Sequence, residues 1–378
     1  MSIQVLKPKY HVEECLEQIR ECLEIGWTGM GFKTVEFENE WKKYTGHENA
    51  HFLNSATVGL HLAVEILKQE NGWNDGDEII TTPVTFVSTN HAILYENMKA
   101  VFADIDEYFC IDPDDVEQKI TDKTRAVIFV GYGGRVGNLE KIIDICKKHN
   151  LKLILDAAHM AGTRVNGIFP GTMEGVDVAV YSFQAVKNLP TADSGMICFK
   201  DGGYDDICRK LSWLGINKDT YSRTTVQGSY KWAYEVDYLG YKDHGNSIIA
   251  AIGLVQLKYL DKDNEYRRTL VKIYDDLLSG HDKIKIVGAN YADECSYHLY
   301  EIIVDDREGL LAALAENDIY GGVHYRDNTE YSLYNYAHGT CPKAHELTQK
   351  NITLPLNLWM TEDDARKVAE IVIKHTNK

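Results

Sequence analysis

The sequence predicts an α/β protein whose larger part is built on a mostly parallel β-sheet. Between residue 51 and about residue 190, short apolar runs alternate with helical patterns, and such alternation is typical of βαβ units whose helices cover both faces of the sheet. A chain of 378 residues also exceeds one average domain, so a large domain with a smaller companion is expected.

The N-terminal segment predicts two helices before the first strand. Residues 10–25 have an amphipathic pattern, which GWTGMG (26–31) ends with three glycines, and a second helix is expected over about 33–44. The apolar run HFLN (51–54) then leads into SATVGLHLAVEILKQ. Small residues at the start and an apolar face predict a helix that follows directly on a strand.

The same order of strand and helix recurs along the chain. Further strands are predicted at EIITTP (78–83), AVFAD (100–104), AVIFV (126–130), LKLILD (151–156) and VDVAVY (176–181). Ligands of such sheets bind beyond the carboxyl ends of the strands. The residues that follow each run are therefore the candidates for a functional site.

The pattern changes after about residue 250. A long helix over 248–280 is followed by SYHLYEIIV, a helix near 307–317, GGVHY and a closing helix, EDDARKVAEIVIKH. Strands mixed with helices in this way predict a smaller α+β domain. We expect a large domain over 1–250 and a small domain over 251–378.

Composition excludes several classes of protein. The net charge of −17 argues against a nucleic-acid surface, which needs clustered Lys and Arg. No stretch has the roughly 20 apolar residues of a membrane span. The eight cysteines form no C-x-x-C pair, so neither a metal site nor a disulfide framework is expected. A soluble, cytoplasmic protein follows as the expectation.

Lys187 is the first candidate for chemistry. It lies in SFQAVKN (182–188), on a turn after a predicted strand. A lysine can trap an aldehyde when its amine loses its proton readily, as partial desolvation allows. A solvated loop lysine is the ordinary alternative. The catalytic interpretation of Lys187 therefore depends on the other candidate residues.

Two further candidates follow strand ends. Asp156 ends LKLILD, where a carboxylate can keep a cofactor's pyridine nitrogen protonated; it could instead cap a helix starting at Ala157. Ser55, Ala56 and Thr57 open a predicted helix, whose free N–H groups and dipole favour a phosphate. Simple capping is again the alternative.

Together these segments resemble one family. The chain resembles the DegT/DnrJ/EryC1/StrS family of sugar aminotransferases from GWTGMG to the last helix. The motifs occur in a single order: NSATVGLHLA, GDEIITTPVTFVST, VFADID, LILDAAHMAG, YSFQAVKN, AAIGLVQL and CPKAHEL…ITLPLN. Each is weak alone, but the ordered set is specific.

The resemblance implies a pyridoxal 5'-phosphate (PLP) enzyme with the PLP-dependent transferase fold, aspartate aminotransferase-like, type I. Lys187 would form the Schiff base and Asp156 would pair with the pyridine nitrogen. The other cofactor contacts implied are His159 near the 3'-oxygen, Phe86 on the ring face, Ser55, Ala56, Thr57 and Ser182 on the phosphate, and Lys242 reaching that phosphate from the neighbouring subunit. The last contact implies a homodimer with shared active sites.

Some segments depart from the family pattern. Members usually carry a glycine–glutamate–glycine–glycine turn where this chain has Ala192-Asp193-Ser194-Gly195, and they differ at GYGGRVGN (131–138) and around His244 and Gly245. These segments lie on the substrate side in the family, so an unusual acceptor is possible. The substrate contacts expected here are Trp27, Thr28, Asn188, His324 and Tyr325.

The reaction expected is transamination from an amino acid, by resemblance L-glutamate, to the ketone of a nucleotide-linked keto-deoxy sugar. A smaller phosphorylated ketone, such as dihydroxyacetone phosphate, is the alternative acceptor. An NAD-dependent oxidoreductase is a remote alternative: GYGGRVG between two strands imitates a dinucleotide-binding turn, but the third glycine of G-x-G-x-x-G is replaced by Val136. A protein that has the PLP-enzyme fold but no catalytic activity is a third alternative.

Overall fold

The computed structural model describes residues 2–217, 234–288 and 294–377. Its centre is a seven-stranded sheet, in which only β7 runs against the other strands. The order across the sheet is β1 (His51–Leu53), β7 (Gly195–Phe199), β6 (Val178–Ser182), β5 (Lys152–Asp156), β4 (Thr124–Val130), β2 (Glu78–Thr81) and β3 (Lys99–Phe102). The predicted α/β class with a mostly parallel sheet is therefore confirmed.

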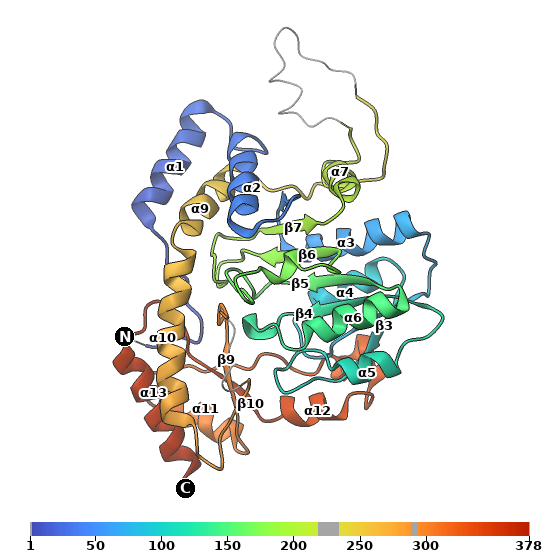
Figure 1. Ribbon diagram of the computed structural model, residues 1–378. Helices are drawn as coiled ribbons and strands as arrows, with labels where there is room; N and C mark the ends of the chain where they lie inside the picture. Colours follow the sequence, from blue (N-terminus) through green and yellow to red (C-terminus); the bar gives the residue numbers. More distant parts are fainter. Residues whose placement is uncertain (1, 218–233, 289–293, 378) are drawn as a thin grey trace.

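Helices surround this sheet (Figure 1). They are α3 (Ala56–Asn71), α4 (Ser88–Tyr95), α5 (Pro113–Gln118), α6 (Leu139–His149) and α7 (Gly202–Leu211). The sequence of α6 shows why they form: Leu139, Ile142, Ile143 and Cys146 recur at helical spacing and are buried. The helix ends at Asn150, which adopts the left-handed conformation (φ 54°) that terminates many helices.

The remaining helices and strands lie at the two ends of the chain. They are α1 (Val12–Ile25), α2 (Phe32–Thr45), α9 (Ser247–Leu257), α10 (Leu260–Leu278), β8 (Lys285–Ile286), β9 (Tyr300–Ile303), α11 (Arg307–Ala315), α12 (Pro342–Thr348), β10 (Asn351–Leu354) and α13 (Glu362–Thr376). Strands β10, β9 and β8 form an antiparallel sheet. Figure 1 shows α10 and α13 side by side next to it. Four short 3-10 helices complete the described elements: Tyr132–Gly134, Pro170–Thr172, Asn328–Glu330 and Ser332–Ala337.

Two clusters of buried apolar side chains accompany the two sheets. The larger surrounds the seven-stranded sheet, and the smaller joins α10, α11 and α13 to the antiparallel sheet. Residues from α12, such as Ala344, nevertheless belong to the larger cluster, and Ile3 pairs with Ile319 beside the smaller one. The boundary at residue 250 stays a prediction, since both ends of the chain cross between the clusters.

Three local expectations differ from the structure. The helix expected over 248–280 is divided into α9 and α10 around Lys258 and Tyr259. No helix begins at Ala157, where the chain makes a turn instead. Strand β7 was not anticipated, because periodicity alone does not identify a short apolar run such as GMICF as a strand.

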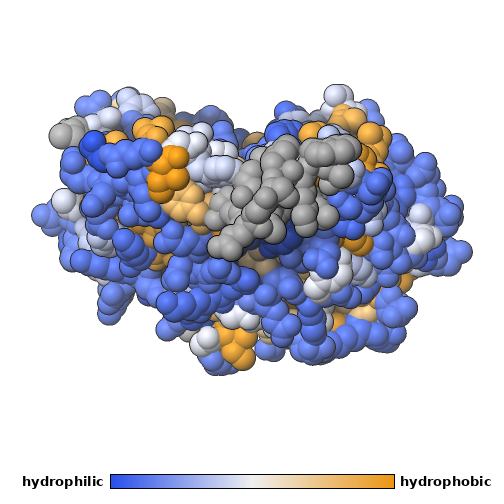
Figure 2. All heavy atoms as spheres, turned by 90° about the horizontal axis from the view of Figure 1, so that it is seen from above, coloured by the Kyte–Doolittle hydropathy of each residue, from blue (hydrophilic) through white to orange (hydrophobic). Residues whose placement is uncertain are grey.

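The surface agrees with the acidic, polar composition. Figure 2 views the molecule from above relative to Figure 1 and shows a mainly hydrophilic face, on which apolar residues form separate small groups. Among the helices of the described residues, none is long and apolar enough to cross a membrane.

Candidate active site

The predicted residues gather where the strands end. Asp156 is the last residue of β5, Ser182 is the last of β6, and Ser55 follows β1. Parallel strands bring these ends to one edge of the sheet. A cavity of about 470 Å³ opens there, within the size range of ligand sites. Its lining includes most of the predicted set: Ser55, Ala56, Thr57, Phe86, Asp156, His159, Ser182, Lys187, His324 and Tyr325.

Lys187 lies on a tight turn beyond β6. Its backbone N–H donates to the Gln184 carbonyl oxygen (2.8 Å), which fixes the turn. The side chain is only partly exposed, and desolvation of the amine lowers the pKa of Lys187 to about 8. The charge of Asp156 opposes this lowering only in part. An amine in this state is the kind that can attack an aldehyde near neutral pH.

His298 was not anticipated from the sequence, yet it is the closest polar neighbour of the lysine. Its Nε2 lies 3.5 Å from Lys187 Nζ, and its Nδ1 lies 3.1 Å from Asn188 Oδ1. The amide of Asn188 donates to Ser296 and Asn264, so Oδ1 is left as an acceptor. The Nδ1 of His298 therefore carries the proton, and its Nε2 lone pair faces the amine.

Asp156 is almost completely buried (3% exposed) on the other side of the cavity. Thr89 Oγ1 donates to Oδ2 (2.7 Å) and the Ala158 N–H donates to Oδ1 (3.1 Å). Burial nevertheless raises the pKa of Asp156, and the two hydrogen bonds and the nearby charge of Lys187 only partly offset this effect. A protonated pyridine nitrogen would supply a paired cation, so the carboxylate fits the cofactor. Because no helix begins at Ala157, the capping alternative for Asp156 is wrong.

His159 is oriented by the glycine turn after β4. The Gly133 N–H donates to His159 Nδ1 (3.2 Å), so the proton of the neutral ring is on Nε2, which lies 3.2 Å from the Tyr325 hydroxyl. Burial and the nearby Lys187 keep the pKa of His159 well below its ordinary value. The GYGGR turn thus fixes the imidazole as a neutral group. It does not open a helix, since α6 starts only at Leu139.

The N-terminus of α3 forms the end of the cavity that fits a phosphate. Ser55 caps the helix, its Oγ accepting from the Val58 N–H (3.3 Å), and Ala56 and Thr57 follow with their N–H groups at the helix start. Gly195 on β7 packs against this point. A Cβ there would lie 2.6 Å from Ala56 N, so glycine is required for the close approach. The cradle therefore has the shape and the donors that a phosphate needs.

Phe86 and the turn before Gly195 complete the lining. The ring of Phe86 is 60% exposed and lies on the wall of the cavity, where it is free to stack on a flat ligand. Asp193 and Ser194, from the turn that departs from the family pattern, also line the cavity. The ring of His324 is oriented by a hydrogen bond between its Nδ1 and Thr353 Oγ1 (2.9 Å).

Four predicted residues do not line the cavity of their own chain. Asn188 lies behind Lys187, where it orients His298. Trp27 donates to the Met30 carbonyl oxygen (2.7 Å), and the Thr28 carbonyl oxygen accepts from Ser247 near the start of α9. Their contact with substrate stays a prediction.

Lys242 is the fourth predicted residue that lies away from the cavity. Its ammonium lies 3.5 Å from the centre of the Trp213 ring, and partial burial lowers its pKa. It does not line the cavity of its own chain. Contact with a phosphate would have to be made in another subunit.

A second hollow, of about 880 Å³, lies at the opposite edge of the sheet. It is bounded by the starts of β4 and β5, and Arg125 in its wall is already paired with Asp77 (2.7 Å). The residues expected to carry chemistry all lie elsewhere. We therefore assign the active site to the smaller cavity at the carboxyl ends of the strands.

The chain is similar to known proteins over nearly its whole length. The chain is 32% identical over 372 residues to the spore coat polysaccharide biosynthesis protein SpsC of Bacillus subtilis, covering 95% of this chain and 94% of that protein. Among solved structures, the sugar aminotransferase CalS13 from Micromonospora echinospora superposes with a TM-score of 0.89 at 27% identity, covering 98% of this chain and 99% of that one. Spr1654 from Streptococcus pneumoniae, in its PLP-form, gives a TM-score of 0.89 at 26% identity, covering 100% and 99%.

The fold and the reaction class follow from these relationships. The chain has the fold of PLP-dependent sugar aminotransferases and is a PLP-dependent aminotransferase. The oxidoreductase alternative is therefore wrong. The model of the DegT/DnrJ/EryC1/StrS aminotransferase family matches residues 9–373, nearly the whole length, and the chain belongs to that family.

Proposed function

We propose that this aminotransferase moves the amino group of an amino acid, L-glutamate, to the ketone of a nucleotide-linked keto-deoxy sugar. The product would serve the synthesis of an amino sugar or a cell-surface polysaccharide. The observation that carries the proposal is the cavity in which the desolvated amine of Lys187 and the buried carboxylate of Asp156 lie together. The sugar class is supported by CalS13 and SpsC, whose names refer to a sugar and to a polysaccharide.

Each region of the cavity suits one part of PLP. Lys187 would hold the aldehyde carbon covalently, Asp156 the pyridine nitrogen and Phe86 the ring face. His159 would lie at the 3'-oxygen. The phosphate would rest on the α3 cradle, formed by Ser55, Ala56, Thr57 and Ser182. When bound, PLP supplies an electron sink that stabilises the carbanion formed at the donor's α-carbon.

The side chains of the protein would then control the protons. Lys187 Nζ, as a free amine, would be a base whose lowered pKa suits proton transfer near neutral pH. His298 Nε2, 3.5 Å away, can accept a hydrogen bond from that amine and orient it. Asp156, as the anion, would keep a proton on the pyridine nitrogen. His159 is neutral, so it adds no positive charge beside the amine of Lys187.

The pH dependence of cofactor uptake tests the state of Lys187. Only the neutral amine attacks an aldehyde, and its fraction grows about tenfold per pH unit below the pKa. With a pKa of about 8, the rate of PLP uptake by cofactor-free protein should rise through neutral pH and level off above about pH 8. Visible absorbance follows the uptake. A rate that still rises steeply at pH 10, as for a free lysine derivative measured in parallel, would contradict this state.

A cation for the phosphate is expected from a second subunit. The described lining at the α3 cradle includes no arginine, and its lysine is Lys187. Charge-assisted contacts are about twice as strong as neutral ones, so a phosphate with close to two negative charges favours one. We infer a homodimer in which Lys242 of each chain reaches the partner's phosphate.

Mixed dimers test the shared site. Lys187→Ala removes the reactive amine and Lys242→Glu weakens phosphate binding, so each variant alone should be nearly inactive. In a hybrid dimer with shared sites, one site carries both defects and the other carries neither. Activity should reappear, at up to about half of the native level per hybrid dimer. No recovery, once exchange of subunits is demonstrated by differential tags, would mean that each chain builds its site alone.

The acceptor is tested by a substrate screen. Purified enzyme with L-glutamate should form 2-oxoglutarate only when a suitable ketone is added, and nucleotide-linked keto-deoxy sugars should be the best. Dihydroxyacetone phosphate, the alternative acceptor, belongs in the same panel. Turnover of the triose phosphate and of none of the nucleotide sugars would replace the proposed acceptor with the alternative.

The expected location of the enzyme is the cytoplasm. All eight cysteines are unpaired and buried in the structure, which suits a reducing compartment.

A further inference from the structure

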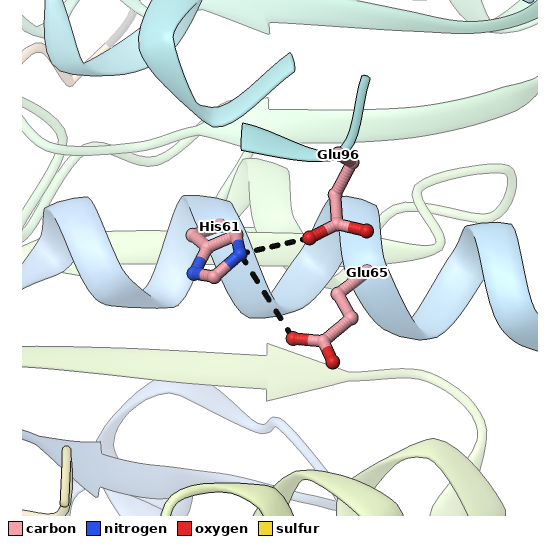
Figure 3. Close-up of side chains that lie close together, drawn as sticks. All are labelled: His61, Glu65 and Glu96. Atoms are coloured by element: carbon pink, nitrogen blue, oxygen red, sulfur yellow. Dashed lines mark hydrogen bonds and ion pairs between the residues drawn. The ribbon is translucent and has the colours of Figure 1, made fainter. Parts of the chain in front are cut away.

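A compact group of metal-ligating side chains lies outside the cofactor cavity. His61 and Glu65 lie one turn apart on α3, and Glu96 follows the last residue of α4 (Figure 3). None of the three lines the cavity. The residues share no sequence motif, because Glu96 is 35 residues from His61. From the geometry of this group we propose that His61, Glu65 and Glu96 bind one divalent transition-metal cation of the Zn²⁺ type.

The distances suit a tetrahedral ion. His61 Nε2 lies 2.9 Å from Glu96 Oε1 and 3.9 Å from Glu65 Oε2, as the dashed lines in Figure 3 show. One ligand atom from each residue falls within 4.8 Å of the other two. Zn–N and Zn–O bonds of about 2.0–2.1 Å place neighbouring ligand atoms about 3.3 Å apart. Rotation of the glutamate side chains toward this spacing would form the site, and a water could take a fourth position.

Charge and burial also favour a cation. The side chains of His61, Glu65 and Glu96 are only 15%, 7% and 15% exposed. Two carboxylates so close together repel each other where water screens them poorly. The nearby Lys68 does not neutralise them, since its ammonium donates to Asp75 and to the backbone carbonyl of Glu96.

Glu65 supplies the independent observation that points to a ligand. Its Oε1 accepts from Gln69 Nε2 (3.1 Å), but its buried Oε2, directed at His61, has no hydrogen-bond partner among the described residues. A buried oxygen without a donor is unfavourable. The Tyr241 hydroxyl also interacts with this carboxylate, but it does not complete a hydrogen bond to Oε2. A bound cation would give Oε2 its missing partner.

The ligand types select the kind of metal. Imidazole favours Zn²⁺ and other transition metals over Mg²⁺ and Ca²⁺, which prefer oxygen ligands alone. The eight cysteines are all buried, so they do not compete for added metal in the folded protein. The ion would tie α3 to the end of α4 and stabilise the folded state by mass action.

A second cluster provides a matched control. His345 Nδ1 lies 3.0 Å from Glu330 and 3.6 Å from Asp327. There, Arg326 donates to Glu330 and Thr329 donates to Asp327, so both carboxylates already have partners. We expect no metal at this cluster.

Zinc titration of the holoenzyme tests the proposal. After treatment with a chelator and its removal, the protein competes with a coloured zinc indicator, and heat unfolding is recorded with and without Zn²⁺. The native protein and His345→Gln should bind one Zn²⁺ per chain with equal affinity and unfold at a higher temperature with it. Outer-shell substitutions already cost ten- to a hundred-fold in metal affinity. His61→Gln, Glu65→Gln and Glu96→Gln should therefore each lose at least about a hundredfold.

The readouts separate metal binding from a simple ion-pair network. Glu65→Gln keeps the shape of the side chain and removes a buried charge, so without zinc this variant should be at least as stable as the native protein. No binding at one equivalent, or binding that survives both His61→Gln and Glu65→Gln, would overturn the proposal. Loss of binding in His345→Gln alone would do the same. None of these results depends on the amino donor or acceptor.

Discussion

Replacement of Lys187 by alanine is expected to abolish transamination, since no other amine lines the cavity among the described residues. The variant should still fold, because an amine on a turn contributes little to packing and its backbone hydrogen bond to Gln184 does not depend on the side chain. The measurements are turnover with L-glutamate, visible absorbance after incubation with PLP, and heat unfolding. Turnover and the absorbance of the lysine–PLP linkage should vanish, with the unfolding temperature nearly unchanged.

Lys141→Ala is the matched control for this prediction. Lys141 is exposed on α6 and does not line the cavity. The Lys141→Ala enzyme should retain native activity. An active Lys187→Ala enzyme with an unchanged spectrum would refute the assignment of Lys187.

Asp156→Asn should lower turnover by at least about a thousandfold, or about 4 kcal/mol at 1.36 kcal/mol per tenfold. The amide cannot hold a proton on the pyridine nitrogen as the carboxylate does, so the cofactor becomes a poorer electron sink. The fold should tolerate the change. The amide oxygen can still accept from the Ala158 N–H, and Thr89 Oγ1, which also contacts Thr85, can turn to accept from the new amide.

Asp144→Asn is the control for this substitution, because Asp144 is an exposed carboxylate on α6. Its turnover should equal that of the native enzyme. If Asp156→Asn lowered only the unfolding temperature and left turnover intact, Asp156 would have a structural role alone.

The sequence could place residues that follow strand ends. Asp156, Ser55 and Lys187 each come after an apolar run, and parallel strands bring such positions to one edge of the sheet. His298 could not be found in this way. It lies 111 residues after Lys187, in the C-terminal part, and only the folded chain brings the two together. The same holds for Gly133, whose N–H fixes the tautomer of His159.

Local patterns were least informative where one signal has two meanings. An aspartate at a strand end fits both a cofactor contact and a helix cap, and only the turn at Ala157 separates them. Asn188 follows Lys187, so a substrate contact was a reasonable expectation, yet its side chain faces Ser296, Asn264 and His298. The proposed role of Lys242 in another subunit could be expected only from the resemblance to the family, because such a contact follows from neither periodicity nor a strand end in one chain.

The identity of the cofactor-bearing residue is the central claim, and borohydride reduction with peptide mapping tests it most directly. Borohydride converts a lysine–PLP linkage into a stable phosphopyridoxyl amine, which mass spectrometry locates after digestion. We predict that the modification lies on Lys187 alone, at one group per chain, and that prior incubation with L-glutamate removes it. A phosphopyridoxyl group on another lysine, or none after saturation with PLP, would contradict the account.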